Sequence, residues 1–281
     1  MQVLKTISGI RKLRQQLSGS VGFVATMGYL HNGHLALVKQ ARAETGVVVA
    51  SIFVNPTQFA PSEDLTVYPR DLKRDLKLLE QEKTDIVFIP SEEEMYPARF
   101  NTWIDVEGIT AKLEGACRPG HFRGVATVVG KLFNIIQPTR AYFGQKDAQQ
   151  SMVIKRMVAD LNMDLEIVVV PTVRESDGLA MSSRNTYLDP EERPAATVLF
   201  KALSLAKELW QQGEKDADQI RRQMTSRIEK EPLAKINYIS IVDVNTLEEL
   251  KIIKPPALAS LAVKIGKTRL IDNILLEQSH I

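Results

Sequence analysis

Cysteine is almost absent from this sequence. The 281 residues include one cysteine, Cys117, so an intrachain disulfide and a cysteine-based metal cage are both excluded. Such scarcity fits a reducing compartment. No activating base lies beside Cys117 in the sequence, and we expect this side chain to be a small apolar filler.

Long apolar runs and blocks of one charge are also missing. No run is long enough to cross a bilayer, and the first 17 residues contain no continuous apolar stretch of signal-peptide length. We therefore expect a cytoplasmic protein with no membrane partner. The formal net charge is only +2, and no basic, aromatic-rich stretch occurs, which argues against a nucleic-acid partner. Any phosphate binding must come from local arrangement.

Short apolar runs alternate with helical patterns in the first part of the chain. The runs typical of strands are 21–25, 47–54, 85–89, 141–143 and 165–170. The helical patterns are a short one within 1–17, then 34–43, 70–83, 120–136 and 147–161. This alternation predicts an α/β fold, a Rossmann-like doubly wound parallel sheet whose ligands bind at the carboxyl ends of the strands.

The pattern changes after about residue 174. Asp189, Pro190 and the two acids that follow form a helix-start signal, and a polar-rich helical stretch continues to about residue 230. Two runs typical of strands follow at 238–244 and 258–265. We predict a Rossmann-like domain over 1–174, and a smaller α+β C-terminal domain over 175–281 that covers the active site.

The segment 27–34 (MGYLHNGH) directly follows an apolar run and contains two of the four histidines. His31 and His34 are three apart, so they face one side at a predicted helix N-terminus, where unpaired N–H groups favour anions. Gly33 lets the backbone approach a ligand closely. The segment therefore predicts an anion cradle. Metal binding is an alternative that lacks a third ligand at suitable spacing, and two exposed turn histidines are another.

Gln58 lies in the turn 53–59 (FVNPTQF), which also follows an apolar run. Its amide offers two donors and an acceptor, which suit a hydroxy acid or its carboxylate. Taken alone, the local sequence favours an ordinary Asn-Pro turn. The Gly- and Arg-rich stretch 114–129 (EGACRPGHFRGVATVV) could cover a substrate pocket, but we interpret it as a surface loop.

Two further turns carry groups suited to phosphate. In 143–150 (FGQKDAQQ), Lys146 at a helix start can meet phosphate and Asp147 can accept from a ribose hydroxyl. The capping-box spacing of Asp147 and Gln150 is an equally good structural explanation. In 177–185 (DGLAMSSRN), two hydroxyls and Arg184 could form a mobile phosphate-binding loop, although a polar turn explains them equally well.

The order and spacing of these segments resemble the pantothenate synthetase family across essentially the whole chain. MGYLHNGH, FVNPTQF, YPRDLKRD, RPGHFRGVATVV, YFGQKDAQQ and VPTVRESDGLAMSSRNTYL carry the resemblance. The His-x-Gly-His element also resembles that of the wider nucleotidyltransferase superfamily, which includes class I aminoacyl-tRNA synthetases. Tyr29, Asn32 and Gln145 are small departures at positions that tolerate variety.

The resemblance implies an ATP-dependent ligase that joins (R)-pantoate to β-alanine through a pantoyl-adenylate and releases AMP and pyrophosphate. It implies a homodimer with Mg²⁺ as cofactor, held mostly by ATP oxygens and water and contacted by Asp75. It implies that Gln58 binds pantoate and β-alanine and that Gln150 binds pantoate. The implied catalytic residues are His34 as proton donor, His31, Lys146, Ser182, Ser183 and Arg184. The implied ATP-site residues are Met27, Gly28, Tyr29, Leu30, His31, Asn32, Gly33, His34, Gly144, Gln145, Lys146, Asp147, Val173, Met181, Ser182, Ser183 and Arg184.

Two other functions are weighed against this one. A nucleotidyltransferase that releases its adenylylated product would use the same turns but form no amide. An RNA-binding module would need a basic surface, which the near-neutral net charge disfavours.

Overall fold

A computed structural model describes residues 1–61 and 63–277 of the chain. The chain divides into two compact units. The first comprises Met1–Gln145 and Gln149–Pro171, and the second comprises Lys146–Ala148 and Thr172–Ile281. Among the described residues, no helix is long and apolar enough to cross a membrane.

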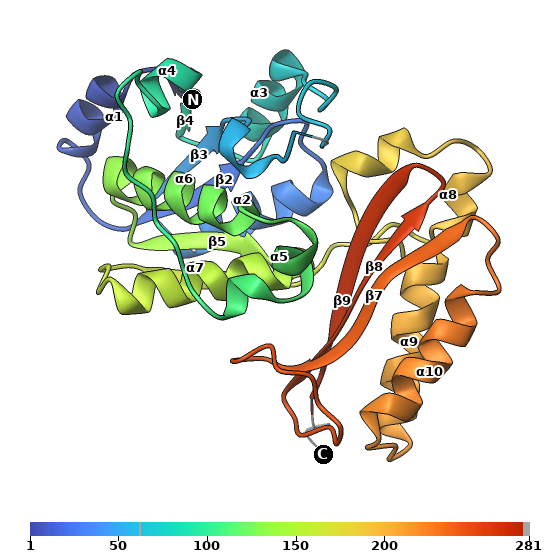
Figure 1. The fold of residues 1–281 in the computed structure, drawn as a ribbon. Coiled ribbons are helices and arrows are strands. Elements are labelled where there is room, and N and C mark those ends of the chain that lie inside the picture. Colours follow the sequence, from blue (N-terminus) through green and yellow to red (C-terminus); the bar gives the residue numbers. More distant parts are fainter. Residues whose placement is uncertain (62, 278–281) are drawn as a thin grey trace. The chain divides into compact units, whose positions relative to one another are not determined.

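The first unit is built on a parallel six-stranded sheet (Figure 1). Its strands, in spatial order, are β1 (Gln2–Leu4), β4 (Ile86–Phe88), β3 (Val47–Ile52), β2 (Val21–Thr26), β5 (Arg140–Gly144) and β6 (Glu166–Val170). The helices that flank it are α1 (Ile7–Arg14), α2 (Asn32–Glu44), α3 (Leu72–Gln81), α4 (Glu92–Met95), α5 (Leu113–Cys117), α6 (His121–Ile136) and α7 (Ala148–Asp160). The parallel α/β sheet is confirmed, but β1 lies in a segment where only a helix was predicted.

Side chains that alternate along each strand give the sheet two buried faces. Val24 packs with Val38 of α2 and Leu79 of α3 in one core cluster. Its neighbour Phe23 points the opposite way, because successive side chains of a strand alternate, and its ring meets Phe133 of α6 with centroids 6.3 Å apart. Both faces are therefore covered by helices, which explains why the strands are nearly continuous apolar runs in the sequence.

The strand order places three predicted turns at one edge of the sheet. The chain steps from β2 to β3 and β4 on one side, and β5 returns to the other side of β2. This reversal is a topological switch point, where ligands of open α/β sheets bind. Residues 27–34 follow β2, Gln58 follows β3, and Gln145 follows β5, so all three leave adjacent carboxyl ends.

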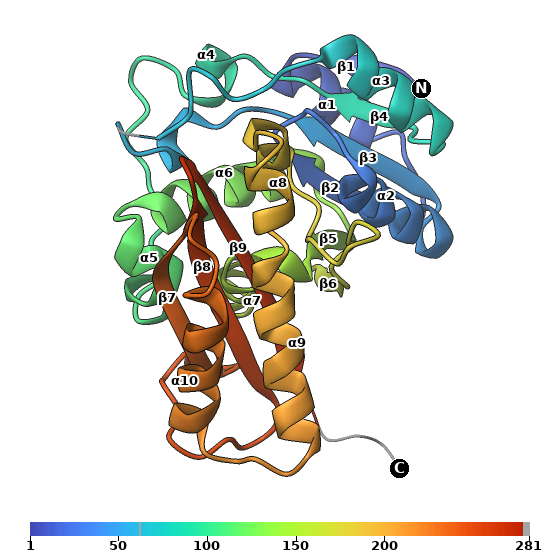
Figure 2. The same cartoon turned by 90° about the vertical axis from the view of Figure 1, so that its right-hand side faces the viewer.

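The second unit consists of a three-stranded antiparallel sheet covered by helices (Figure 2). Its elements are α8 (Glu192–Ala195), α9 (Val198–Gln211), α10 (Ala217–Ile228), β7 (Ala234–Asp243), β8 (Ala257–Ile265) and β9 (Thr268–Leu276). Helices α9 and α10 lie side by side against the sheet and share an apolar core with it. The predicted helical stretch is thus three helices, α8, α9 and α10, and β9 was not predicted.

Candidate functional site

His31 and His34 form a capping box at the start of α2. The His31 Nδ1 accepts from the Gly33 N–H at 3.1 Å, and the His34 Nδ1 accepts from the His31 N–H at 3.3 Å. A backbone N–H can only donate, so neither Nδ1 carries a proton in this arrangement. Each neutral imidazole then has its proton on Nε2, which makes both rings hydrogen-bond donors. The rings lie together, with centroids 4.0 Å apart.

The turn before these histidines is held by Asp75 of α3. Gly28 and Tyr29 have positive φ angles of 83° and 50°, which bring two successive N–H groups to one side. The Tyr29 N–H donates to Asp75 Oδ2 at 2.7 Å, and the Leu30 N–H donates to Oδ1 at 2.8 Å. Asp75 is 1% exposed. The two N–H groups therefore donate to a carboxylate that belongs to the protein itself.

Gln58 is connected to the turn after β2 through its side chain. Its Nε2 lies 3.2 Å from the Met27 sulfur, and its Oε1 accepts from Asn55 Nδ2 at 3.0 Å. Asn55 is 1% exposed, and its Oδ1 accepts from the hydroxyls of Thr57 and Tyr96. The amide of Gln58 thus has a defined orientation. Asn55 and Tyr96 were not predicted as site residues, although Asn55 lies in the same sequence motif.

The stretch predicted to be a surface loop is instead helical and partly buried. α5 and α6 occupy most of it, and His121, the first residue of α6, is 9% exposed. His121 and Arg118 contact the backbone of Gln58, and Arg118 also contacts the side chain of Glu63. The helix predicted over 120–136 is confirmed as α6, and the surface-loop interpretation of 114–129 was wrong because the apolar residues of α6 pack into the core. Cys117 is exposed, so the prediction of an apolar filler was also wrong.

The end of β5 leads into α7, which carries the predicted pantoate residue. Gln150 is half-buried in the first turn of α7. Its neighbour Gln149 is buried and ties the helix to the chain before α5: its Oε1 accepts from Glu114 N, and its Nε2 donates to the carbonyl oxygens of Ile109 and Lys112. Gln149 therefore fixes the helix turn that presents Gln150.

Lys146 and Asp147 belong to the second unit although they directly follow β5. The Lys146 carbonyl accepts from Asn273 Nδ2 of β9 at 2.8 Å. Its ammonium lies 3.5 Å from Asp147 Oδ1. The side chain of Lys146 is 20% exposed, so the charge is only partly shielded from a ligand. Asn273, which no sequence motif marked, thus fixes the backbone of a predicted phosphate-binding residue.

An ion pair between Arg174 and the buried Asp272 stabilises the segment that contains the predicted serines and arginine. Arg174 contacts Asp272 through two nitrogens, at 2.6 and 3.0 Å, and donates to the Gly178 carbonyl. Burial raises the pKa of the Asp272 carboxyl, although Arg174 opposes that shift. The same segment is closed by a hydrogen bond from Met181 N to the Val173 carbonyl.

The predicted phosphate-binding loop leads into a short 3-10 helix, Ser183–Tyr187. Ser182 caps it by accepting from the Arg184 N–H, and Ser183 is buried. Within this helix, the side-chain amide of Asn185 donates to the Ala180 carbonyl and to the Glu175 carboxylate. The predicted residues from Val173 to Arg184 therefore share one structured segment of the second unit.

A metal centre made by the protein alone is not found in the described part of the chain. Residues 1–61 and 63–277 contain no group of three or more His, Cys, Asp or Glu side chains placed to hold an ion. Asp75, the residue implied to contact Mg²⁺, directs both oxygens to backbone N–H groups.

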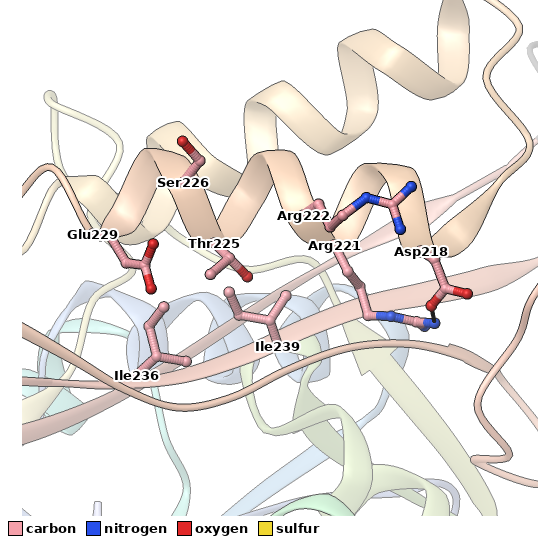
Figure 3. A pocket seen from close by; sticks show the side chains of 8 residues that line it. All are labelled: Asp218, Arg221, Arg222, Thr225, Ser226, Glu229, Ile236 and Ile239. Atoms are coloured by element: carbon pink, nitrogen blue, oxygen red, sulfur yellow. Dashed lines mark hydrogen bonds and ion pairs between the residues drawn. The ribbon is translucent and has the colours of Figure 1, made fainter.

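A separate cavity of about 400 Å³ lies between α10 and β7 in the second unit (Figure 3). Its lining residues are Asp218, Arg221, Arg222, Thr225, Ser226, Glu229, Ile236 and Ile239. Arg221 is already paired with Asp218 and with Glu249, the latter at 2.7 Å. The cavity includes none of the predicted site residues.

The parallel sheet with polar turns at its switch point defines the class of the protein, an α/β nucleotide-binding protein. Within that class, the chain belongs to the pantoate-beta-alanine ligase family, whose model matches residues 2–275. The pantothenate synthetase of Roseiflexus sp. (strain RS-1) is 62% identical over 277 residues, which cover 99% of this chain and 100% of that protein.

Solved structures of the family have the same fold. The pantothenate synthetase of Thermus thermophilus is 49% identical with a TM-score of 0.95, covering 99% of this chain and 100% of that one. A pantoate-beta-alanine ligase from Francisella tularensis, complexed with beta-gamma ATP and beta-alanine, is 37% identical with a TM-score of 0.82, covering 99% of both chains.

Proposed function

We propose that the protein condenses (R)-pantoate with β-alanine, driven by ATP, through a bound pantoyl-adenylate, and releases pantothenate, AMP and pyrophosphate. The observations that carry the proposal are the capping box of His31 and His34 at the switch point and the oriented amide of Gln58, which contacts Met27 of the same turn. Membership of the pantoate-beta-alanine ligase family supports it, as do the beta-gamma ATP and beta-alanine in complex with the Francisella relative.

In the first step, a pantoate carboxylate oxygen attacks the α-phosphorus of ATP, and the bond to pyrophosphate breaks. Negative charge grows on the phosphate oxygens, and preorganised donors lower the barrier most when they are aimed at that charge. The Nε2–H groups of His31 and His34 are such donors, and we assign His34 the hydrogen bond from its Nε2–H to the phosphate oxygens that gain charge as pyrophosphate leaves. Lys146 and Arg184 supply positive charge, and Ser182 and Ser183 supply hydroxyl donors.

In the second step, the free amine of β-alanine attacks the acyl carbon of the adenylate. The amide bond forms, the bond from the acyl carbon to the AMP oxygen breaks, and the amine loses a proton. Gln58 and Gln150 hold the acid in attack geometry, and such positioning lowers the barrier by several kcal/mol. No covalent enzyme intermediate is required.

The remaining assignments rest on the family resemblance. The ATP-site residues are those of 27–34 and 144–147, with Val173 and 181–184. Mg²⁺ would be held mostly by ATP oxygens and water, with Asp75 as the protein contact that the resemblance implies, and would supply Lewis acidity at the phosphates. We further propose a homodimer in the cytoplasm, with a nucleotide- and pantoate-binding domain over 1–174 and a smaller α+β domain over 175–281.

The test is a reaction with all three substrates and Mg²⁺. We expect pantothenate and AMP in equal amounts, and neither product when pantoate is omitted. An adenylylated product that accumulates without amide formation would instead support the nucleotidyltransferase alternative.

A further inference from the structure

We propose that His121 and Arg118 are positioning residues for the ligase reaction, because they hold the backbone carbonyl of Gln58 and thereby aim its side chain at pantoate. The inference deepens the proposed function and rests on the assignment of Gln58 to pantoate binding. Neither His121 nor Arg118 was among the predicted site residues.

Arg118 is fixed by a two-point contact with Glu63. Its Nε lies 2.6 Å from Glu63 Oε1, and its Nη2 lies 2.8 Å from Oε2. Such a fork-to-fork pair fixes the plane of the guanidinium as well as its position. The remaining nitrogen, Nη1, lies 3.0 Å from His121 Nε2. The ion pair therefore directs one N–H of Arg118 at the imidazole.

The contact with Arg118 decides which nitrogen of His121 carries the proton. A guanidinium can only donate, so His121 Nε2 must accept, and the proton of the neutral ring lies on Nδ1. Nδ1 is 2.8 Å from the Gln58 carbonyl oxygen and donates to it. Arg118 thus donates to Glu63 on one side and to His121 on the other, and His121 passes the donation on to the Gln58 carbonyl.

The charge state of His121 agrees with these donor and acceptor roles. Burial, and next the Arg118 charge, lower the pKa of His121 to about 4, although the Gln58 carbonyl and the carboxylates of Glu63 and Glu114 oppose the shift. At neutral pH the imidazole is therefore uncharged. A proton added to Nε2 would face the guanidinium and break the contact.

The same helix also sets the backbone of residues 57 and 58. Gly124 lies three residues after His121 on α6, and a Cβ at that position would be 2.4 Å from the Thr57 carbonyl oxygen and 2.8 Å from Gln58 Cα. Asn55 fixes the Gln58 amide separately, because its Nδ2 donates to Gln58 Oε1 at 3.0 Å and to the Gly124 carbonyl at 3.2 Å. Backbone and side chain of Gln58 are thus held by different contacts.

The test compares His121→Ala with His121→Asn. An asparagine amide reaches the place of the imidazole Nδ1 and can still donate to the Gln58 carbonyl, whereas alanine cannot. In pantoate-dependent exchange of pyrophosphate into ATP, we expect His121→Ala to raise the KM for pantoate about tenfold, the usual effect of one lost hydrogen bond at a site. We expect the KM for ATP to stay within about twofold, and His121→Asn to recover most of the loss.

A double-mutant cycle shows whether His121 acts through Gln58. If it does, His121→Ala changes the rate of the Gln58→Ala protein by less than about twofold, since coupled residues are not additive. The proposal would be overturned if His121→Ala slowed the Gln58→Ala protein by the same factor as it slows the wild-type protein. It would also be overturned if His121→Ala raised the KM values for pantoate and ATP equally.

Two controls keep the outcomes separate. If His121→Ala does not fold, Arg118→Lys takes its place, because it keeps the charge and loses the fork; an unchanged KM for pantoate in that variant would contradict the proposal. If the unmodified protein forms no pantothenate, the proposed function itself fails. An active protein whose His121 variants bind pantoate normally rejects only the positioning role.

Discussion

The carboxylate of Asp75 accepts the backbone N–H of Tyr29 at 2.7 Å, and it does so from a position that is 1% exposed. The contact joins α3 to the turn that precedes His31 and His34. Because Leu30 donates to the other oxygen, the carboxylate holds two successive N–H groups of a turn with positive φ angles. Asp75 is therefore placed to orient the histidines rather than only to meet a metal ion.

Replacement of Asp75 by asparagine separates these two roles. Asparagine has one acceptor oxygen and presents an NH₂ group where the second N–H needs an acceptor, so we expect the adenylation rate to fall about tenfold or more. The Mg²⁺ concentration for half-maximal rate should not change. Exchange of pyrophosphate into ATP, measured over a Mg²⁺ series, gives both quantities.

Asp71 offers a matched control on the same helix. It caps α3 by accepting from the Arg74 N–H, so Asp71→Ala should reduce the free energy of unfolding by about 1 kcal/mol without slowing the reaction. If Asp75→Asn instead needed much more Mg²⁺ yet reached the normal maximal rate, a metal contact would be the better explanation.

The tautomer of His34 can be tested with two amides. Glutamine reaches the place of Nε2 and can donate to a phosphate oxygen, whereas asparagine reaches only the place of Nδ1. We expect His34→Ala and His34→Asn to lower the adenylation rate by roughly a hundredfold or more, and His34→Gln to lose less. Single-turnover formation of the adenylate measures this step, and equal losses in the glutamine and asparagine variants would argue against an Nε2–H donor.

Gly124 has no room for a side chain because backbone atoms surround it. Gly124→Ala places a Cβ 2.4 Å from the Thr57 carbonyl oxygen, and we expect a loss of about 1–3 kcal/mol in the free energy of unfolding. Gly130, on the same helix, is the control: its added Cβ would meet only the flexible end of Ile104 at such short range. Urea unfolding of both variants should show Gly124→Ala as clearly the less stable; similar losses would mean that the Gly124 contact is not rigid.

The lowered pKa of His121 makes stability depend on pH. The pKa falls from its ordinary value of 6.5 to about 4 because of burial and Arg118. Between those pH values the unfolded chain binds a proton at this residue and the folded protein does not. The contribution of the neutral ring is therefore complete above about pH 6.5 and is lost as pH falls toward 4, by up to about 1.4 kcal/mol per pH unit.

Urea unfolding of the wild-type and His121→Asn proteins between pH 4.5 and 7 checks this dependence. Other titratable groups contribute to the pH dependence of both proteins. One is Glu63: burial raises its pKa, but the contacts with Arg118 outweigh burial, so the net shift is downward. The difference between the two curves isolates His121. We expect the wild-type protein to lose more stability on acidification, and parallel curves would contradict the assignment.

The strands and helices of the first unit were predictable where apolar periodicity was strong. The run 47–54 contains β3, and the stripe of leucines in 70–83 contains α3. The strand β1 was missed because its three residues, Gln2–Leu4, are stabilised by pairing with β4, a contact across the chain that local sequence does not encode. β9 was missed for the same reason, since its pairing with β8 makes a strand of a segment with mixed composition.

Candidate site residues could be named from the sequence where polar groups directly follow apolar runs. His31 and Lys146 were singled out in this way, whereas Gln58 was assigned through the family resemblance because its local sequence favours an ordinary turn. The residues that hold the predicted turns in place were not singled out, because they act through contacts with distant parts of the chain; they include Asn55, His121 and Asn273. Asn273, for example, donates to the Lys146 carbonyl across 127 positions of the chain.

The acyl-adenylate is the central claim, and it can be tested by labelling the carboxylate of pantoate with ¹⁸O. Attack of that carboxylate on the α-phosphorus transfers one labelled oxygen to AMP when β-alanine displaces it. Mass spectrometry of the products should therefore show one ¹⁸O in AMP for each pantothenate formed. Label in pyrophosphate or orthophosphate, or unlabelled AMP alongside pantothenate, would contradict the mechanism.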